Sequence, residues 1–405
     1  MSRASAALGV LVSTAALANG RAPAPISIAV PGAEPTMMLL GSTFGLVASD
    51  DGGGSWWWFC EQAIGYGGVY DPRFAVGPDG DLWAPVPLGL ARSRDDGCGF
   101  ERTEAPLAGL APTDLVVAGG VIYATAAAEP SEPGRGLLLR SLDGGATFEA
   151  LLETERALHG IAVSGDDPDR LYVGATEEDP DAAWLLRSDD GGQSFAEAGI
   201  DLDDIVAVRP VGAWGNAPSV VLVIADREAG SVLLRSEDGG ATLDAVQESF
   251  GRLSGFAMDG AEGVFASSVA DGIYRSSDGG RSFVRETSPR ASGLAWRSPY
   301  LYATGTPSDG FALGRSADGA LGFERVMALD EIDGPRACPT GTPEADVCAP
   351  LWPGVALSLG IDPTAARDGG ATDAAPPGDS GSSIDGAEPD HAPAGGCACS
   401  LGKPL

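Results

Sequence analysis

One short pattern, Ser-x-Asp-x-Gly-x-x-aromatic, occurs seven times and constrains the fold more than any other feature of the sequence. Its copies begin at Ser49, Ser93, Ser141, Ser188, Ser236, Ser276 and Ser316, at steps of 40 to 48 residues. Leu243 replaces the aromatic residue in the fifth copy, and Ala320 replaces the glycine in the seventh. A repeat of this length predicts a series of similar supersecondary units that pack against their neighbours.

The chemistry of the pattern is that of a tight turn between two strands. The Asp carboxylate accepts backbone N–H bonds, and Gly adopts the positive φ that such a turn requires. We therefore expect seven structural aspartates: Asp51, Asp95, Asp143, Asp190, Asp238, Asp278 and Asp318. An Arg precedes the Ser in six copies, and its recurrence indicates a structural role: Arg92, Arg140, Arg187, Arg235, Arg275 and Arg315.

Each repeat contains four short runs with strand character. In the fourth repeat these are residues 159–163, 170–175, 183–188 and 194–198. The chain also has 59 Gly and 30 Pro among 405 residues, which suits a fold with many turns. The sequence predicts an all-β fold, a single seven-bladed β-propeller of four-stranded antiparallel blades, over residues 19–330.

The repeated pattern resembles the Asp-box, or BNR repeat, of sialidases, sortilin-type receptors, xyloglucanases and photosystem assembly factors. The resemblance covers about residues 26–330 and places the pattern between the third and fourth strand of each blade, away from the binding face. It implies the fold and says little of the activity. This chain lacks the Phe-Arg-Ile-Pro motif of sialidases, and its seven predicted blades differ from their six. Xyloglucanases resemble two propellers around a groove, whereas this chain has one.

The two ends of the chain differ from the repeats. Residues 1–18 read as a signal peptide, with Arg3, an apolar stretch and the cleavage motif Ala16-Leu17-Ala18. Residues 362–405 read as a disordered acidic tether with a Gly-Cys-rich end. That end resembles the C-terminal sorting tails of myxobacterial surface proteins, although their hydrophobic helix and basic cluster are lacking. The predicted location is secreted or on the outer cell surface.

Six cysteines behind a signal peptide indicate an oxidising compartment. We expect Cys338 to pair with Cys348 inside residues 331–361, a disulfide-containing cap or clasp, and Cys60 to pair with Cys98 across adjacent blades. The triple tryptophan at 56–58 either packs against this cap or forms an exposed platform for a glycan or partner.

The net charge of −32 opposes nucleic-acid binding, and no apolar stretch is long enough for a transmembrane helix. The only histidines, His159 and His391, lie in different regions, so we expect no histidine metal site and no cofactor. Acidic runs such as 166–169, 177–179 and 201–204 leave calcium possible. No nucleophile elbow or phosphate-binding Gly loop is present.

Loops that join the second to the third strand, and one blade to the next, form the expected binding face. Their candidate ligand-binding residues are Tyr66, Tyr70, Asp71, Arg73, Arg156, Glu177, Asp179, Asp203, Arg252 and Arg290. We predict a monomeric, non-enzymatic module that recognises a protein or a glycan. The alternative is a glycoside hydrolase that uses two carboxylates of this face, on a polysaccharide or, less favoured, on sialic acid.

Overall fold

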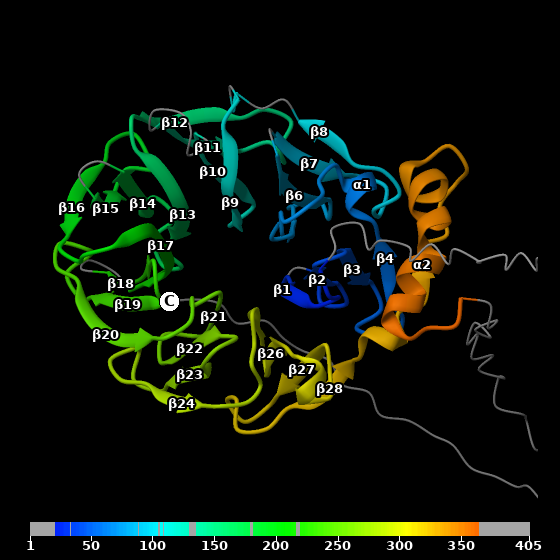
Figure 1. Ribbon diagram of the computed structural model, residues 1–405. Coiled ribbons are helices and arrows are strands. Elements are labelled where there is room, and N and C mark those ends of the chain that lie inside the picture. The colour runs from blue at the N-terminus through cyan, green and yellow to red at the C-terminus, as the bar shows by residue number, and fades with distance from the viewer. Residues whose placement is uncertain are drawn as a thin grey trace, which may run out of the picture. The chain divides into compact units, whose positions relative to one another are not determined.

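Seven antiparallel sheets follow one another along the chain and stand around a central axis, as the computed structural model shows (Figure 1). The structure describes residues 21–363 except 33, 88, 104–105, 108, 129–134, 179–180 and 216–218. The predicted signal peptide, and the tether from residue 364 onward, lie outside the described residues. The predicted seven-bladed propeller is confirmed, and each blade has four antiparallel strands in chain order.

The first four blades are formed by β1 (Pro25–Ala29), β2 (Met38–Ser42), β3 (Gly45–Ser49) and β4 (Trp57–Phe59); β5 (Ala75–Val76), β6 (Leu82–Val86), β7 (Gly89–Ser93) and β8 (Glu101–Thr103); β9 (Ala111–Ala118), β10 (Val121–Ala127), β11 (Gly136–Ser141) and β12 (Glu149–Thr154); β13 (Ala157–Val163), β14 (Leu171–Glu178), β15 (Asp181–Ser188) and β16 (Ala196–Ile200).

The last three blades are formed by β17 (Ile205–Trp214), β18 (Val220–Arg227), β19 (Ser231–Ser236) and β20 (Asp244–Ser249); β21 (Gly255–Asp259), β22 (Gly263–Ser268), β23 (Gly272–Ser276) and β24 (Val284–Glu286); β25 (Leu294–Arg297), β26 (Tyr300–Thr304), β27 (Leu313–Ser316) and β28 (Glu324–Met327). The middle strands β2, β6 and β7 are buried along their whole length, because neighbouring blades cover both of their faces.

The seven repeat turns are built from the same three hydrogen bonds. In every copy the Ser hydroxyl donates to the Asp carboxylate, at 2.6–2.8 Å. The backbone N–H of the fifth residue donates to the Ser hydroxyl, at 2.7–3.0 Å. The N–H of the seventh residue donates to the Asp, at 2.9–3.1 Å. Even Ala320 keeps a positive φ of 77°.

Contacts between neighbouring blades reuse the repeated arginine and aromatic residue. Arg140, Arg187 and Arg235 each donate to a glycine carbonyl in the turn of the next blade, at 2.8–3.0 Å. The aromatic residue of the third turn, Phe148, lies edge-on to Trp83 of the second blade, with ring centroids 6.1 Å apart. The repeated pattern therefore forms each turn and also joins one blade to the next.

The segment after the seventh blade packs on the first blade. It contains a 3-10 turn, η2 (Leu329–Glu331), the short strand β29 (Gly334–Pro335), a π-helical turn, η3 (Glu344–Cys348), and α2 (Ala349–Leu359). β29 runs parallel to β4, and Trp58 lies 5.5 Å from Trp352 between ring centroids. The packing interpretation of the triple tryptophan is thus supported for Trp58, which is buried.

The predicted disulfide pairing is wrong, although all four cysteines are in disulfides. Cys60 pairs with Cys348 and Cys98 pairs with Cys338, across 288 and 240 residues of sequence. The reason is the position of residues 331–361, which place one cysteine beside blade 1 and the other beside blade 2. A short helix, α1 (Glu61–Ile64), follows Cys60 and contacts η3.

Candidate functional site

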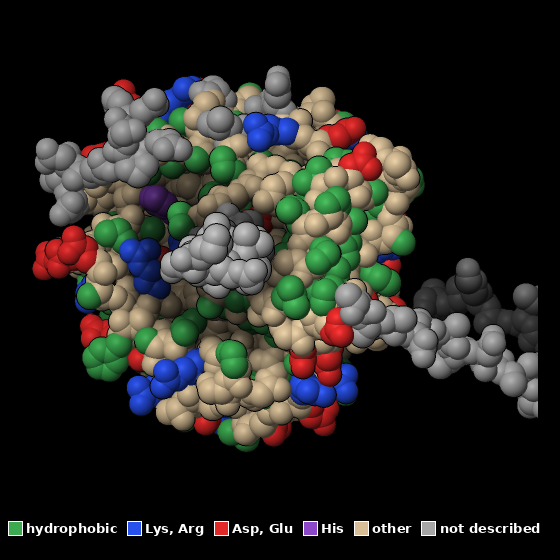
Figure 2. All heavy atoms as spheres, turned by 45° about the vertical axis from the view of Figure 1, so that its right-hand side comes forward, with side chains coloured by type: hydrophobic (Ala, Val, Ile, Leu, Met, Phe, Trp, Pro, Cys, Tyr) green, Lys and Arg blue, Asp and Glu red, His purple; other side chains and the backbone are tan. Residues whose placement is uncertain are grey.

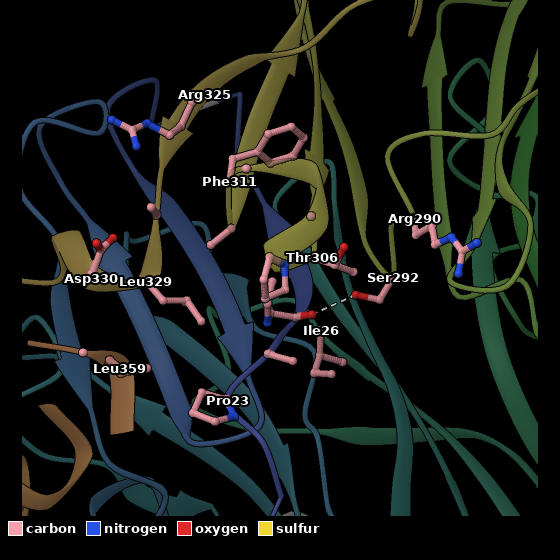
Figure 3. Close-up of a pocket in the computed structure, with 18 of the residues that line it drawn as sticks. Pro23, Ile26, Arg290, Ser292, Thr306, Phe311, Arg325, Leu329, Asp330 and Leu359 are labelled. Carbon is pink, nitrogen blue, oxygen red and sulfur yellow. Dashed lines mark hydrogen bonds between the residues drawn. The ribbon is translucent and has the colours of Figure 1, made fainter. Parts of the chain in front are cut away.

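A cleft of about 710 Å³ opens on the expected binding face, where blade 7 meets blade 1 and the C-terminal segment (Figure 3). We call it the seam cleft. Its walls are residues 23–26 at the start of β1, 305–307 and 310–312 between β26 and β27, 328–330 around η2, and 358–360 at the end of α2. Val269, Arg290, Ser292 and Arg325 complete the lining.

Local hydrogen bonds hold the wall between β26 and β27 in place. It contains a 3-10 turn, η1 (Pro307–Asp309), in which Asp309 accepts from the backbone N–H and hydroxyl of Thr306, at 2.8 and 2.6 Å. Ser288 donates to the other oxygen of Asp309, at 3.0 Å. Burial alone would raise the pKa of Asp309, but these bonds outweigh it and lower the pKa.

The floor of the seam cleft joins blade 7 to blade 1. The Ser292 hydroxyl donates to the carbonyl oxygen of Pro25 at 2.9 Å, as the dashed line in Figure 3 shows. Leu329 and Phe311 lie in two of the walls, and Phe311 stacks on Phe323 with ring centroids 6.0 Å apart. The cleft is thus formed by segments that are distant in sequence and held by specific contacts.

The chemistry of the seam cleft is predominantly apolar. Among the described residues that line it, Asp330 is the only carboxylate, and Arg290 and Arg325 are the only basic groups. Arg325 forms an ion pair with Glu331 at 3.0 Å. Such a surface favours burial of apolar side chains over acid–base chemistry.

Three apolar side chains of the C-terminal segment are exposed. Val347, Leu351 and Leu357 are 40%, 42% and 69% exposed on η3 and α2. Figure 2 shows hydrophobic side chains grouped on this side of the molecule. Leu357 directly precedes Ser358, which lines the cleft, and exposed apolar surface is a common mark of a protein-binding site.

Of the predicted site residues that the structure describes, only Arg290 lines the seam cleft. Tyr66 and Tyr70 pack edge-on at 6.1 Å. Burial raises the pKa of both phenols, that of Tyr70 to about 12. Asp71 forms a two-bond ion pair with Arg21, each bond 2.7 Å long. These three residues therefore have packing or pairing partners within the protein.

The other predicted residues in the described part of the chain do not line the seam cleft. Arg156 pairs with Glu177 and Glu197, both at 2.9 Å, and stacks over Trp184 at 3.9 Å. Asp203 and Arg252 are exposed, and Asp179 lies outside the described residues. Arg73 projects into the central channel and donates to the carbonyl oxygen of Ser254 at 2.7 Å.

One cluster of metal-ligand residue types occurs in the described part of the chain, at Cys60, Glu344 and Cys348. Its two sulfur atoms form a disulfide, so they are not available as thiolate ligands. Glu344 is fully buried, and this burial raises the pKa of its carboxyl to about 8.

Sequence reasoning did not identify the apolar lining of the seam cleft. Ile26, Phe311, Leu329 and Leu359 resemble ordinary core residues in the sequence, and nothing in the repeat shows that they meet. The only signal was topological, because the loop 306–310 and the segment 331–361 both fall beside the expected ring closure.

Comparison with solved structures shows similarity in fold. An ancestral GH74 enzyme is 13% identical with a TM-score of 0.51, over 73% of this chain and 47% of that one. YCF48 from Cyanidioschyzon merolae is 14% identical with a TM-score of 0.46, over 69% and 92%. A GH74 xyloglucanase from Xanthomonas campestris is 17% identical with a TM-score of 0.32, over 76% and 71%.

These likenesses extend to the fold alone. The chain spans about half the length of the ancestral GH74 enzyme. No protein-family model matches the sequence, and no curated protein sequence matches it either. In the described residues, no helix is long and apolar enough to cross a membrane.

Proposed function

We propose that the chain is a non-enzymatic recognition module that binds an apolar segment of a partner protein in the seam cleft. The observation that carries the proposal is the apolar lining of a cleft of about 710 Å³ on the face opposite the repeat turns. Clefts of this size and character bind apolar groups and use a few polar groups at the rim for orientation.

A glycoside hydrolase is less well supported at this cleft. Hydrolysis of a glycosidic bond requires two carboxyl groups on either side of it. Among the described lining residues Asp330 is the only one, so the second carboxyl group is missing there. Elsewhere on this face Asp71 and Glu177 are paired with Arg21 and Arg156.

The remaining features of the proposal concern family and location. Seven turns with the same three hydrogen bonds support a divergent Asp-box propeller. Two disulfides support secretion or exposure on the outer cell surface. We propose that the chain acts there as a monomer without a cofactor, and calcium binding by its acidic loops is a separate possibility to test.

The test is selection of peptides from a phage-displayed random library on the purified protein, with a glycan array and a hydrolysis screen in parallel. We expect apolar peptides, and we expect Leu329→Asp to weaken their binding about thirtyfold, as at an interface hot spot. The matched control is Leu321→Asp, because Leu321 is 63% exposed on a repeat turn.

Equal peptide binding by Leu329→Asp and the unaltered protein would contradict the proposal. Glycan binding without peptide binding would move the site to another part of this face. Turnover of a glycan would favour the hydrolase instead.

A further inference from the structure

The central channel contains a second, smaller cavity of about 250 Å³. Its lining comes from all seven blades and includes Arg73, Asp114 and Ser254. It shares no lining residue with the seam cleft. The site is therefore independent of the function proposed above.

Arg73 is the basic side chain that lines this cavity. It lies two residues before β5 and reaches across the channel to the Ser254 carbonyl oxygen beside β21, at 2.7 Å. A guanidinium has five N–H donors, and this is the one hydrogen bond that Arg73 makes within the described protein. Most of its donors therefore have no hydrogen-bond partner among the described residues, and the side chain lines the cavity.

The neighbouring charged side chains, Arg209 and Asp226, already have hydrogen-bond partners within the protein. Arg209 donates to both oxygens of Asp226, at 2.9 and 3.2 Å, and to the Leu253 carbonyl oxygen at 2.6 Å. Asp226 also accepts from Ser231 at 2.6 Å. These contacts satisfy the carboxylate of Asp226 without Arg73.

Two further polar groups of the channel are also engaged. Asp114 accepts the backbone N–H groups of Leu115 and Ile161, at 3.0 and 3.3 Å. His159 lies 2.8 Å from the Thr176 hydroxyl, and burial together with Arg209 lowers its pKa to about 4. His159 is therefore neutral at pH 7 and adds no positive charge to the cavity.

The electrostatic environment of Arg73 favours an added anion. The Arg73 side chain is exposed to the channel. The nearby Arg209 guanidinium adds positive potential there, whereas the carboxylates of Asp114 and Asp226 oppose it. An anion that enters the channel can therefore reach the free N–H donors of the guanidinium directly.

We propose that Arg73 is the principal ligand of a small-carboxylate site in the central channel. The guanidinium fork matches a carboxylate through two parallel hydrogen bonds, which a water molecule cannot reproduce. A cavity of about 250 Å³ accommodates formate or acetate, and its half-apolar wall of Phe74, Ile161 and Phe256 suits a short alkyl group.

The experiment is isothermal titration calorimetry of the full chain with sodium formate at constant ionic strength. We expect one saturable site in the unaltered protein. Arg73→Gln is expected to weaken the affinity at least about tenfold, and Arg73→Lys to give an intermediate loss because it keeps the charge without the fork. Arg281→Gln is the matched control, since Arg281 is 61% exposed beside a repeat turn.

Absence of a saturable site tighter than about 10 mM in the unaltered protein would overturn the proposal. So would unchanged formate affinity in folded Arg73→Gln. Circular dichroism of each variant establishes folding, and Arg73→Lys provides the comparison if Arg73→Gln does not fold. Equal losses in Arg73→Gln and Arg281→Gln would indicate general charge screening and would also contradict the site.

Discussion

The rim of repeat turns and the opposite face of the ring are built in different ways. Each turn is complete within eight residues, and the same three hydrogen bonds recur in all seven blades. The opposite face depends on contacts between residues far apart in sequence, such as Ser292 with Pro25 and Cys60 with Cys348. The rim therefore repeats, whereas the binding face is assembled only once.

We expect the largest loss of stability when a disulfide that holds the C-terminal segment to the ring is removed. Replacement of Cys98 and Cys338 together by Ser removes a disulfide across 240 residues, and we expect a loss of about 2–5 kcal/mol in the free energy of unfolding. Denaturant unfolding measures it. The parallel double replacement at Cys60 and Cys348 is the matched comparison.

Cys98 lies within the turn of blade 2, so the Cys60–Cys348 disulfide is the one that tests the seam. If it proved less important than one repeat turn, the contrast between a self-contained rim and a cross-linked seam would not hold. The same variants report on the seam cleft, because residues 328–330 and 358–360 form its walls. Peptide binding should therefore fall together with stability.

A smaller effect concerns the turns themselves. Hydrogen bonds from Thr242 and Ser236 lower the pKa of Asp238 to about 2, and similar bonds lower those of Asp143 and Asp190 to about 2. A carboxyl with a depressed pKa stabilises the folded state fully above its unfolded pKa, near 4, and loses that contribution as the pH falls toward 2.

We therefore expect the folded protein to lose stability between about pH 4 and pH 2. Asp238→Ala should cost about 1–2 kcal/mol at neutral pH through its lost hydrogen bonds, and the difference from the unaltered protein should shrink below pH 4. Denaturant midpoints across this pH range measure both effects. A constant difference at all pH values would refute the role of the ionised carboxylate.

The smallest effect is expected at the exposed edge of blade 4. Arg156 pairs with Glu177 and Glu197 near the surface, where such pairs contribute less than about 1 kcal/mol. Arg156→Gln should change the unfolding midpoint little and leave peptide binding unchanged. A clear loss of peptide binding would extend the functional surface to this edge and weaken the assignment to the seam cleft.

Much of the fold was predictable because its main determinants are local. The turn beginning at Ser188 brings together Asp190, Gly192 and Ser194 without any help from distant residues. The site was predictable only in part. Arg290 lies on a loop whose face follows from strand order, but Leu329 and Leu359 look like ordinary apolar residues until the seam is closed.

The number of blades, their order and the chemistry of each turn follow from seven copies of one short motif, because each copy satisfies its own backbone groups. The closure of the ring, the pairing of the cysteines and the position of the apolar cleft do not follow from that motif. These depend on the docking of residues 331–361 against blades 1 and 2. Contacts across 240 to 288 residues leave no periodic signal in the chain.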